Sequence, residues 1–387
     1  MTDKTNMALP GPLIQACERR QHRLRQAMSD HPIAALLVSS PKDIYYLTGF
    51  VGHDSVLMVT DSAAVIITDS RYDEFLEPWR GTSVAEVVMG TRHRLEDSVA
   101  GQCKSRGVAK LGIEAEWLTV SARTKVAAAL TQGQVVDTVG LVGRLRMVKD
   151  ELELAAIERA GAIQCDALNA ALSRFEYGMT ERELCAVLEY EMKTRGASGP
   201  SFDTMVLTGP NSAIIHALTG ETRIDQGTLL IDWGAVFDGY CSDMTRTFAV
   251  GEFPAKVREI YDIVAEAQQA GMDACQPGKV CAEVDAAARS IIHRSGYGEF
   301  FGHGLGHGLG LDIHEDPYFN ELTTEIVLEP GMVMTVEPGI YLPGIGGVRL
   351  EDDLVITSDG CRVLTNFPKH PDEMVIEPAT ATRGSTR

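Results

Sequence analysis

Two aspartates stand where an apolar strand and a tight turn would bring them together. Asp232 interrupts the apolar run Leu229–Val236, and Asp238-Gly239 is a strong signal for a two-residue hairpin turn. With that turn, position 232 faces 245, so Asp243 lies diagonally from Asp232 on one face of the hairpin. The two carboxylates would repel each other, and one would have a raised pKa unless a cation lay between them. A solvated acidic hairpin is the alternative, and the apolar run around Asp232 argues against it.

A second candidate segment is FGHGLGHGLGLDIHE, residues 301–315, which holds three of the ten histidines of the chain, His303, His307 and His314. Its glycines allow backbone and ligands to come close. It is not a phosphate loop, because no Lys-Ser/Thr follows, and H-E-x-x-H is incomplete because position 318 is tyrosine. One histidine could be a hydrogen-bonded core residue, whereas three within twelve residues indicate a site.

Two glutamates end apolar runs in the following segment. Glu337 precedes the turn residues Pro338-Gly339, and Glu351 closes the run GVRL just after Arg349. Either glutamate alone could be an accident of a strand end, but both occur beside the aspartate pair and the histidines. His216, in SAIIHALTG, precedes the acidic hairpin and alone would be an ordinary histidine.

Together these residues predict a dinuclear metal centre. Four carboxylates and one imidazole that converge in one pocket need a compensating charge of about +4, which two divalent cations supply. Oxygen-rich ligation with one nitrogen favours Mn²⁺, with Co²⁺, Fe²⁺ and Zn²⁺ as alternatives. Carboxylates that bridge two ions hold them about 3.5–4 Å apart, a spacing at which a shared hydroxide can attack a polarised carbonyl.

Composition excludes several other classes of protein. The chain has 387 residues and a net charge of −19, which makes it a poor partner for nucleic acid or an anionic membrane. Its eight cysteines form no C-x-x-C pair, so a zinc ribbon or a disulfide framework is not expected. The first residues lack the apolar stretch of a signal peptide, and no apolar run is long enough to span a membrane. We therefore expect a cytoplasmic protein.

The elements that must position these residues fall into two domains. Residues 12–141, after a flexible leader, alternate strands and helices and predict a small α/β domain. Its expected strands are 32–40, 55–60, 63–68, 83–89, 110–114 and 134–139, and its expected helices are 15–28, 94–106 and 121–130. Residues 142–370 predict a second domain with helices at 149–175, 180–195, 255–274 and 280–295 and glycine-rich strands between them. Residues 371–387 are expected to form a loose tail.

The chemistry-bearing segments resemble those of the pita-bread metallopeptidase family, in its Xaa-Pro peptidase branch of aminopeptidase P and prolidase. The segments are DWGA, GYCSDMTRT, GHGLGHGLGLDIHE, TVEPGIY and RLED, in this order between residues 232 and 352. SPKDIYYLTGF and ITDSRY are similar to the N-terminal domain that creatinase, prolidase and aminopeptidase P share. The resemblance implies an α/β N-terminal domain followed by an α+β pita-bread catalytic domain, and it implies a homodimer.

The resemblance also implies a role for each matching residue. Asp243 and Glu351 would bridge two metal ions, and Glu337 would take the proton from the bridging water. The implied metal ligands are Asp232, Asp243, His307, Glu337 and Glu351. The implied substrate-binding residues are His216, His303, His314 and Arg349, of which His216 and His314 would also stabilise the tetrahedral intermediate or shuttle a proton. Arg349 would orient Glu351 or meet a substrate carboxylate.

The implied function is a metal-dependent exopeptidase that hydrolyses the Xaa-Pro bond at peptide N-termini. The substrate would be a peptide with proline at its second position, and the choice between dipeptide and longer peptide stays open. A metal-dependent lyase or C–N hydrolase of a small molecule on the same fold is one alternative, and a non-catalytic interaction module is another. Creatinase-like members and interaction modules have lost metal ligands, whereas this chain keeps all five, so the metal-dependent lyase stays open as an alternative.

Overall fold

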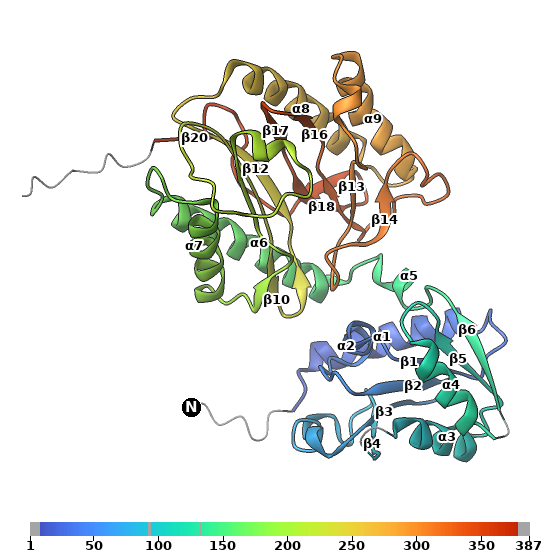
Figure 1. Cartoon of the computed structure of the whole chain (residues 1–387). Coiled ribbons are helices and arrows are strands. Elements are labelled where there is room, and N and C mark those ends of the chain that lie inside the picture. Colours follow the sequence, from blue (N-terminus) through green and yellow to red (C-terminus); the bar gives the residue numbers. More distant parts are fainter. Residues whose placement is uncertain (1–7, 92–93, 132, 378–387) are drawn as a thin grey trace, which may run out of the picture. The chain divides into compact units, whose positions relative to one another are not determined.

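The computed structural model describes residues 8–91, 94–131 and 133–377. The chain divides into two units, residues 1–146 and residues 147–387, which are drawn in Figure 1. We call the second unit the catalytic unit, because it contains all the predicted site residues. Residues 1–7, most of the expected leader, and residues 378–387, most of the expected tail, lie outside the described residues.

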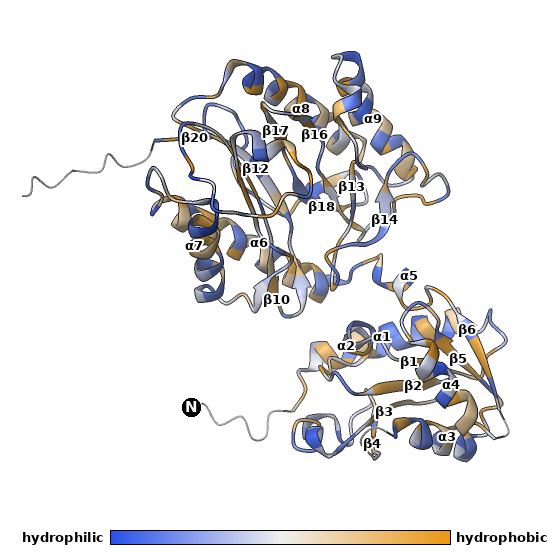
Figure 2. Cartoon of the chain, in the orientation of Figure 1, coloured by the Kyte–Doolittle hydropathy of each residue, from blue (hydrophilic) through white to orange (hydrophobic). Residues whose placement is uncertain are grey.

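The first unit is built on a mixed six-stranded sheet with helices packed against it. The strand order is β4-β3-β2-β1-β5-β6. In Figure 2 its strands are largely hydrophobic in colour, and they supply buried side chains such as Leu37, Val65 and Ile113. Its strands are β1 (Ala35–Val38), β2 (Val56–Thr60), β3 (Ala64–Thr68), β4 (Glu86–Met89), β5 (Lys110–Glu114) and β6 (Gln134–Thr138). This arrangement confirms the predicted α/β class.

Part of the helical structure of this unit was not expected from the sequence. α1 (Gly11–Met28), α3 (Leu95–Arg106) and α4 (Val120–Ala129) match expected helices. The short α5 (Gly143–Arg146), which ends the unit, was not expected, and neither was α2 (Pro41–Thr48). Ser40 caps it by accepting from the amide of Asp43, and Gly49 ends it with a φ of +70°. Serine-proline at its start and glycine at its end are the signals that could have predicted it.

Four long helices surround the strands of the catalytic unit. They are α6 (Glu151–Leu172), α7 (Glu181–Thr194), α8 (Ala255–Ala274) and α9 (Cys281–Arg294). Figure 1 shows α6 and α7 on one side of the central strands and α8 and α9 on the other. A capping box begins α7, with Thr180 and Glu183 each bonding the backbone of the other. Tyr240, buried at the hairpin, donates its hydroxyl to Glu153 of α6 at 3.2 Å.

The strands of the catalytic unit form two main sheets, with orders β20-β12-β9-β8 and β14-β13-β15-β18-β19. The first contains β8 (Met205–Thr208), β9 (Gly227–Trp233), β12 (Met244–Val250) and β20 (Val375–Ile376). The second contains β13 (Gly306–Gly308), β14 (Glu315–Phe319), β15 (Val333–Val336), β18 (Asp352–Ile356) and β19 (Cys361–Val363). Two small sheets join β7 (Gly199–Pro200) with β10 (Ala235–Phe237) and β11 (Tyr240–Cys241), and β16 (Gly339–Leu342) with β17 (Gly346–Arg349). This is the α+β catalytic fold that was expected.

The predicted acidic hairpin has the expected register. Thr245 lies opposite Asp232, and the turn at Asp238 and Gly239 has positive φ at both residues, as a type I′ turn requires. The hairpin is interrupted at Gly234, where a Cβ atom would lie 2.0 Å from the carbonyl oxygen of Ser242. Only glycine allows this close approach, which divides the hairpin between two sheets.

Part of the expected tail is held by a sheet. β20 pairs in parallel with β12, with Ala249 opposite Val375. Pairing with a strand more than a hundred residues earlier is not visible in the local composition, so residues 375–376 differ from the loose segment that composition suggests. Within the described ranges, no helix is both long and apolar enough to cross a bilayer.

Candidate metal centre

The five predicted metal ligands lie within or next to five strands of the catalytic unit. Asp232 lies on β9, and His307 lies on β13. The other three stand one residue outside a strand: Asp243 precedes β12, Glu337 follows β15 and Glu351 precedes β18. Strand ends suit this task because the backbone there is held by the sheet while the side chain can turn toward a shared point.

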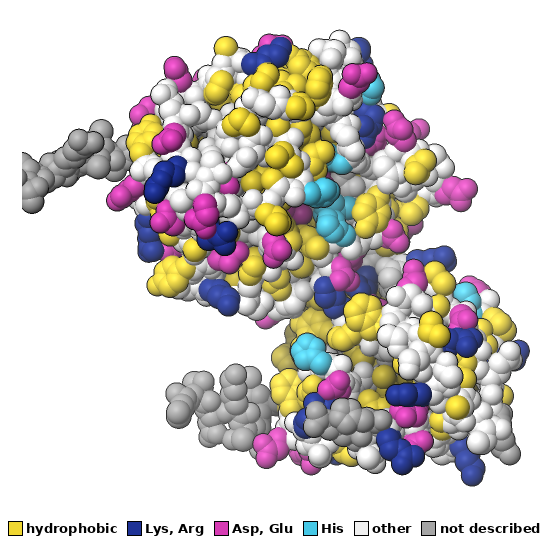
Figure 3. Space-filling model, in the orientation of Figure 1, with side chains coloured by type: hydrophobic (Ala, Val, Ile, Leu, Met, Phe, Trp, Pro, Cys, Tyr) yellow, Lys and Arg dark blue, Asp and Glu magenta, His cyan; other side chains and the backbone are white. Residues whose placement is uncertain are grey.

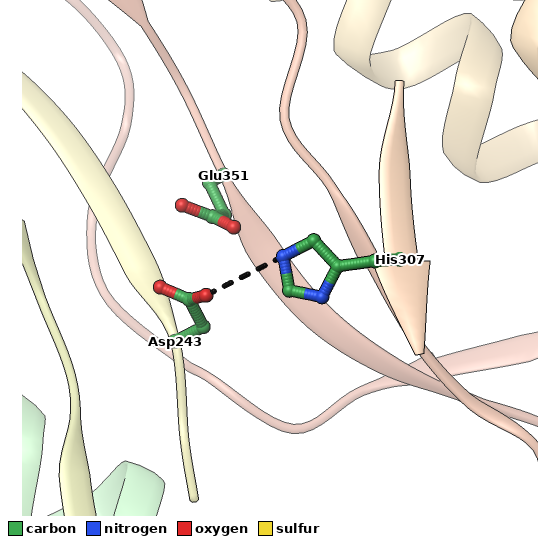
Figure 4. A group of neighbouring side chains, drawn as sticks. All are labelled: Asp243, His307 and Glu351. Carbon is green, nitrogen blue, oxygen red and sulfur yellow. Dashed lines mark ion pairs between the residues drawn. The ribbon is translucent and has the colours of Figure 1, made fainter. Parts of the chain in front are cut away.

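Asp243, His307 and Glu351 form the closest group. One ligand atom from each residue lies within 4.8 Å of the others, and all three side chains are buried. Figure 4 shows the two carboxylates and the imidazole pointing toward one another from separate strands. Nε2 of His307 lies 3.7 Å from Oδ2 of Asp243 and 3.4 Å from Oε1 of Glu337.

The tautomer of His307 suits a metal ligand. Its Nδ1 lies 3.0 Å from the carbonyl oxygen of Gly308, which can only accept, so Nδ1 carries the proton. Burial, followed by the nearby His314, lowers the pKa of His307 to about 4, so the ring is neutral at physiological pH. Nε2 therefore presents a lone pair to carboxylate oxygens, an arrangement of acceptors that a cation would satisfy.

The acids of this cluster are electrostatically dependent on one another. Burial, then the charges of Glu351 and Asp232, raises the pKa of Asp243 well above its usual range. Burial, then Glu337 and Asp232, does the same to the pKa of Glu351. Burial raises the pKa of Glu337 to about 8. Without a compensating positive charge, these groups could not all be ionised at neutral pH.

Two oxygens of the cluster provide a direct test of whether a metal would fit. Oδ1 of Asp232 and Oδ1 of Asp243 are buried and accept no hydrogen bond within the described residues. A buried carboxylate oxygen without a partner is costly, and a divalent cation would supply the missing interaction. The donor set of carboxylates and one neutral imidazole therefore fits divalent metal ions.

A chain of hydrogen bonds supports the cluster from one side, and the sequence analysis named only part of it. Arg349, buried at the end of β17, donates to Asp232 at 2.5 Å, to the Tyr341 hydroxyl at 3.0 Å and to Oγ1 of Thr245 at 2.9 Å. Thr245 in turn donates to Oε2 of Glu351 at 2.7 Å. The Tyr341 hydroxyl lies 2.9 Å from Nε2 of His303. Thr245 could have been found from the hairpin register, which already placed it opposite Asp232.

A second group of buried charges lies behind the ligands and was also missed. Oδ2 of Asp353 accepts the backbone amide of the ligand Asp243 at 2.9 Å. The neighbouring Asp352 pairs with Arg246 at 2.6 Å and with Lys369 at 2.6 Å. Arg246, with no exposed surface, also donates to the carbonyl oxygen of Glu351. These side chains therefore hold the backbone at two of the predicted ligands, Asp243 and Glu351.

The remaining predicted residues lie at the surface beside the cluster. His314 is exposed, and the centroid of its ring lies 4.4 Å from the ring centroid of His307, with the two rings in an edge-to-face arrangement. His216 is exposed and is close enough to His303 to contribute to lowering its pKa to about 4, after burial and Arg349. Figure 3 shows histidines gathered on the surface of the catalytic unit and bordered by hydrophobic side chains. The structure thus brings all the predicted site residues into one region.

The fold and the site define a metallohydrolase, and comparison with known proteins identifies its family. The family model of metallopeptidase family M24 matches residues 155–358, and that of the creatinase/prolidase N-terminal domain matches residues 20–148. The chain belongs to metallopeptidase family M24 and has a creatinase/prolidase N-terminal domain.

Named relatives extend over nearly the whole chain. The chain is 37% identical to the Xaa-Pro dipeptidase of Pyrococcus furiosus, over 90% of this chain and 98% of that protein. The solved structure of the Xaa-Pro dipeptidase from Bacillus anthracis matches with a TM-score of 0.88 and 39% identity, over 93% of this chain and 99% of that one. The X-Pro aminopeptidase from Thermotoga maritima matches with a TM-score of 0.84 and 33% identity, over 91% and 100% of the two chains.

Proposed function

We propose that this protein is a metal-dependent exopeptidase that hydrolyses the Xaa-Pro bond at peptide N-termini, with dipeptides as its preferred substrates. The observation that supports this function most strongly is the neutral imidazole of His307, whose free Nε2 faces Asp243 and Glu337 within a buried acidic cluster. Relatives named Xaa-Pro dipeptidase, at 36–39% identity over most of the chain, support the substrate class and the dipeptide preference.

The metal centre would hold two divalent ions, and Mn²⁺ is the ion we propose first because oxygen donors dominate the ligand set. Its ligands would be Asp232, Asp243, His307, Glu337 and Glu351. When bound, the ions supply Lewis acidity toward the scissile carbonyl and lower the pKa of a water molecule. Four carboxylates and the guanidinium of Arg349 leave a charge of −3, which two divalent ions would change to +1. A site of that charge suits an anionic group such as the carboxylate of a dipeptide.

The side chains around the cluster would divide the remaining tasks. Glu337, largely buried and beside His307, would accept the proton of the attacking water. His216 and His314, both exposed, would contact the substrate, and either could donate a proton or a hydrogen bond as the carbonyl oxygen becomes negative. His303 would line the pocket, held through Tyr341.

Peptide hydrolysis with matched substrates tests this proposal. The purified protein, loaded with Mn²⁺, should cleave an Xaa-Pro dipeptide and should be slower on the Xaa-Pro-Yaa tripeptide with the same first residue. A dipeptide without proline is the control and should not be cleaved at a comparable rate. Absence of cleavage of both proline substrates by protein shown to contain metal would exclude the peptidase function, whereas faster tripeptide cleavage would exclude only the dipeptide preference.

We also propose a cytoplasmic, homodimeric protein. All eight cysteines are free thiols, which supports a reducing compartment. The dimer is proposed from the family resemblance alone, and light scattering during size-exclusion chromatography tests it, since a mass near the 42.0 kDa of one chain would contradict it.

A further inference from the structure

A buried carboxylate outside the metal centre holds both ends of the segment that carries His216. Glu181 is the first residue of α7, and its side chain has no exposed surface. Its Oε1 accepts from the backbone amide of Thr208 at 2.8 Å and from Nδ2 of Asn211 at 3.0 Å. Its Oε2 accepts from the backbone amide of Gly220 at 3.0 Å. One carboxylate therefore joins positions 208, 211 and 220.

These three positions enclose the segment 209–219, part of which is exposed on the surface of the catalytic unit. Between them, Ile214 is 56% exposed and Leu218 is 84% exposed, and His216 is also exposed. Side chains with so much exposed surface cannot position their own backbone by packing. The location of His216 therefore depends on the two ends of the segment, residues 208–212 and 219–220, which we call its stems.

The hydrogen bonds that Glu181 accepts from both stems require a carboxylate at this position. None of the ion pairs in the described part of the chain includes Glu181, so its burial is compensated by hydrogen bonds and by its place at the start of α7. A helix start alone could be served by many residues. Only a carboxylate offers acceptors on both oxygens, which accepting from both stems requires.

The stems are also tied to the strand that leads into the metal centre. Oγ of Ser212 accepts the amide of Gly347 at 2.9 Å, on β17, two residues before Arg349. On the other stem, Thr219 donates to the carbonyl oxygen of Thr204 at 2.9 Å. These contacts connect the segment 209–219 to the elements that hold Arg349 and Asp232. A shift of either stem would therefore move His216 relative to the predicted metal ligands.

We propose that Glu181 is a positioning residue that holds the segment 209–219 so that His216 stays at the substrate site. The proposal rests on the proposed role of His216 in the peptidase reaction. Glu181 touches neither substrate nor metal in this scheme and acts only through the two stems.

The decisive variant is Glu181→Gln, in which one oxygen becomes an NH₂ group that faces an N–H donor. The matched control is Glu183→Gln, two residues later in the same helix, where the carboxylate accepts from the backbone amide and the hydroxyl of Thr180 in the capping box. Hydrogen exchange of the metal-loaded protein should become faster in peptides that cover residues 209–220 in Glu181→Gln and should stay at the wild-type rate there in Glu183→Gln. Unchanged exchange in Glu181→Gln would overturn the proposal, whether or not the protein proves to be a peptidase.

Steady-state kinetics distinguish a role of Glu181 in positioning His216 from a general disturbance of the fold. In otherwise wild-type protein, Glu181→Gln should lower kcat/KM for an Xaa-Pro dipeptide about 10- to 100-fold, a loss typical of a misplaced catalytic group. Added to His216→Ala, the same change should cost less than about twofold, because coupled residues are not additive. Equal losses in both backgrounds would overturn the proposal.

A milder variant guards against misfolding of Glu181→Gln. Asn211→Ala removes one of the three donors and leaves the carboxylate intact. It should show the same local increase in exchange and the same dependence on His216, with smaller amplitude. Wild-type exchange and kinetics in Asn211→Ala, with Glu181→Gln insoluble, would overturn the proposal.

Discussion

Nη2 of Arg349 donates a hydrogen bond to Oδ2 of Asp232 at 2.5 Å, and both side chains are largely buried. The family resemblance implied that Arg349 orients Glu351 or meets a substrate carboxylate. Its hydrogen-bond partner in the cluster is another predicted ligand, Asp232, and the hydroxyl of Thr245 connects it to Glu351. Arg349 therefore places a positive charge beside Asp232 and, through Thr245, links two predicted ligands from different strands.

The variant Thr245→Val should break the hydrogen-bonded link from Arg349 to Glu351 and leave the fold intact. The valine keeps the shape of the side chain but cannot donate to Glu351 or accept from Arg349. We expect activity or metal affinity to fall about 10- to 100-fold, the usual effect of losing an outer-shell partner. Steady-state kinetics and metal titration measure this effect.

Thr228→Val is the matched control for this prediction. Thr228 is also buried in the same sheet, and none of the hydrogen bonds in the described residues joins its hydroxyl to a carboxylate of the cluster. It should lose some stability and keep near wild-type kinetics. Equal kinetic losses in both variants would show that the sheet, rather than the link to Glu351, sets the activity.

Glu337→Gln should abolish most activity without unfolding the protein. The amide keeps the size of the side chain but cannot accept a proton, and general-base catalysis typically contributes about 10²–10⁴-fold. Circular dichroism should match the wild type, while kcat falls by at least that order. A variant with kcat close to wild type would contradict the assignment of Glu337 as the base.

Chelation should destabilise the protein as well as inactivate it. Removing the cations leaves buried carboxylates that must either repel or bind protons, and the loss is about 2.7 kcal/mol if the metal was present at about 100 times its Kd. Thermal unfolding with and without a chelator measures the change, and added Mn²⁺ should reverse it. Asp243→Asn, which loses a charged ligand, should respond less. An identical melting temperature with and without chelator in the wild type would contradict a metal bound in this cluster.

The first unit should show its own pH dependence through Glu114. Burial, then the charge of Asp43, raises the pKa of Glu114 from 4.5 to about 8, although Oε2 accepts from the amides of Ser39 and Ser40. Arg146 pairs with Asp43 at 2.7 Å. Because the folded state holds a proton that the unfolded state has lost, stability should fall as the pH rises from 4.5 to about 8 and level off above that.

Glu114→Gln should remove this dependence. The amide has no proton to lose, so the free energy of unfolding should change less between these pH values, by about 1–3 kcal/mol relative to wild type. Denaturant titrations at several pH values measure the difference. Glu116→Gln, at an exposed position nearby, should behave like the wild type. A wild-type slope in Glu114→Gln would show that other groups cause the dependence.

Local patterns determined much of this protein. The hairpin register followed from Asp238-Gly239, because a two-residue turn specifies which residues face each other, and the ranges expected for α7 and α8 match the structure closely. The ligand types were also visible in the sequence, since acids and histidines inside apolar runs are costly without a partner.

Only the tertiary structure decided which groups support those ligands. Arg349 and Asp232 are 117 positions apart, and Asp353 lies 110 positions from the amide of Asp243 that it holds. Glu181 likewise reaches both stems of the His216 segment from another helix. Such pairs depend on how sheets and helices pack, and residue spacing along the chain contains no information on that packing until the elements are placed in space.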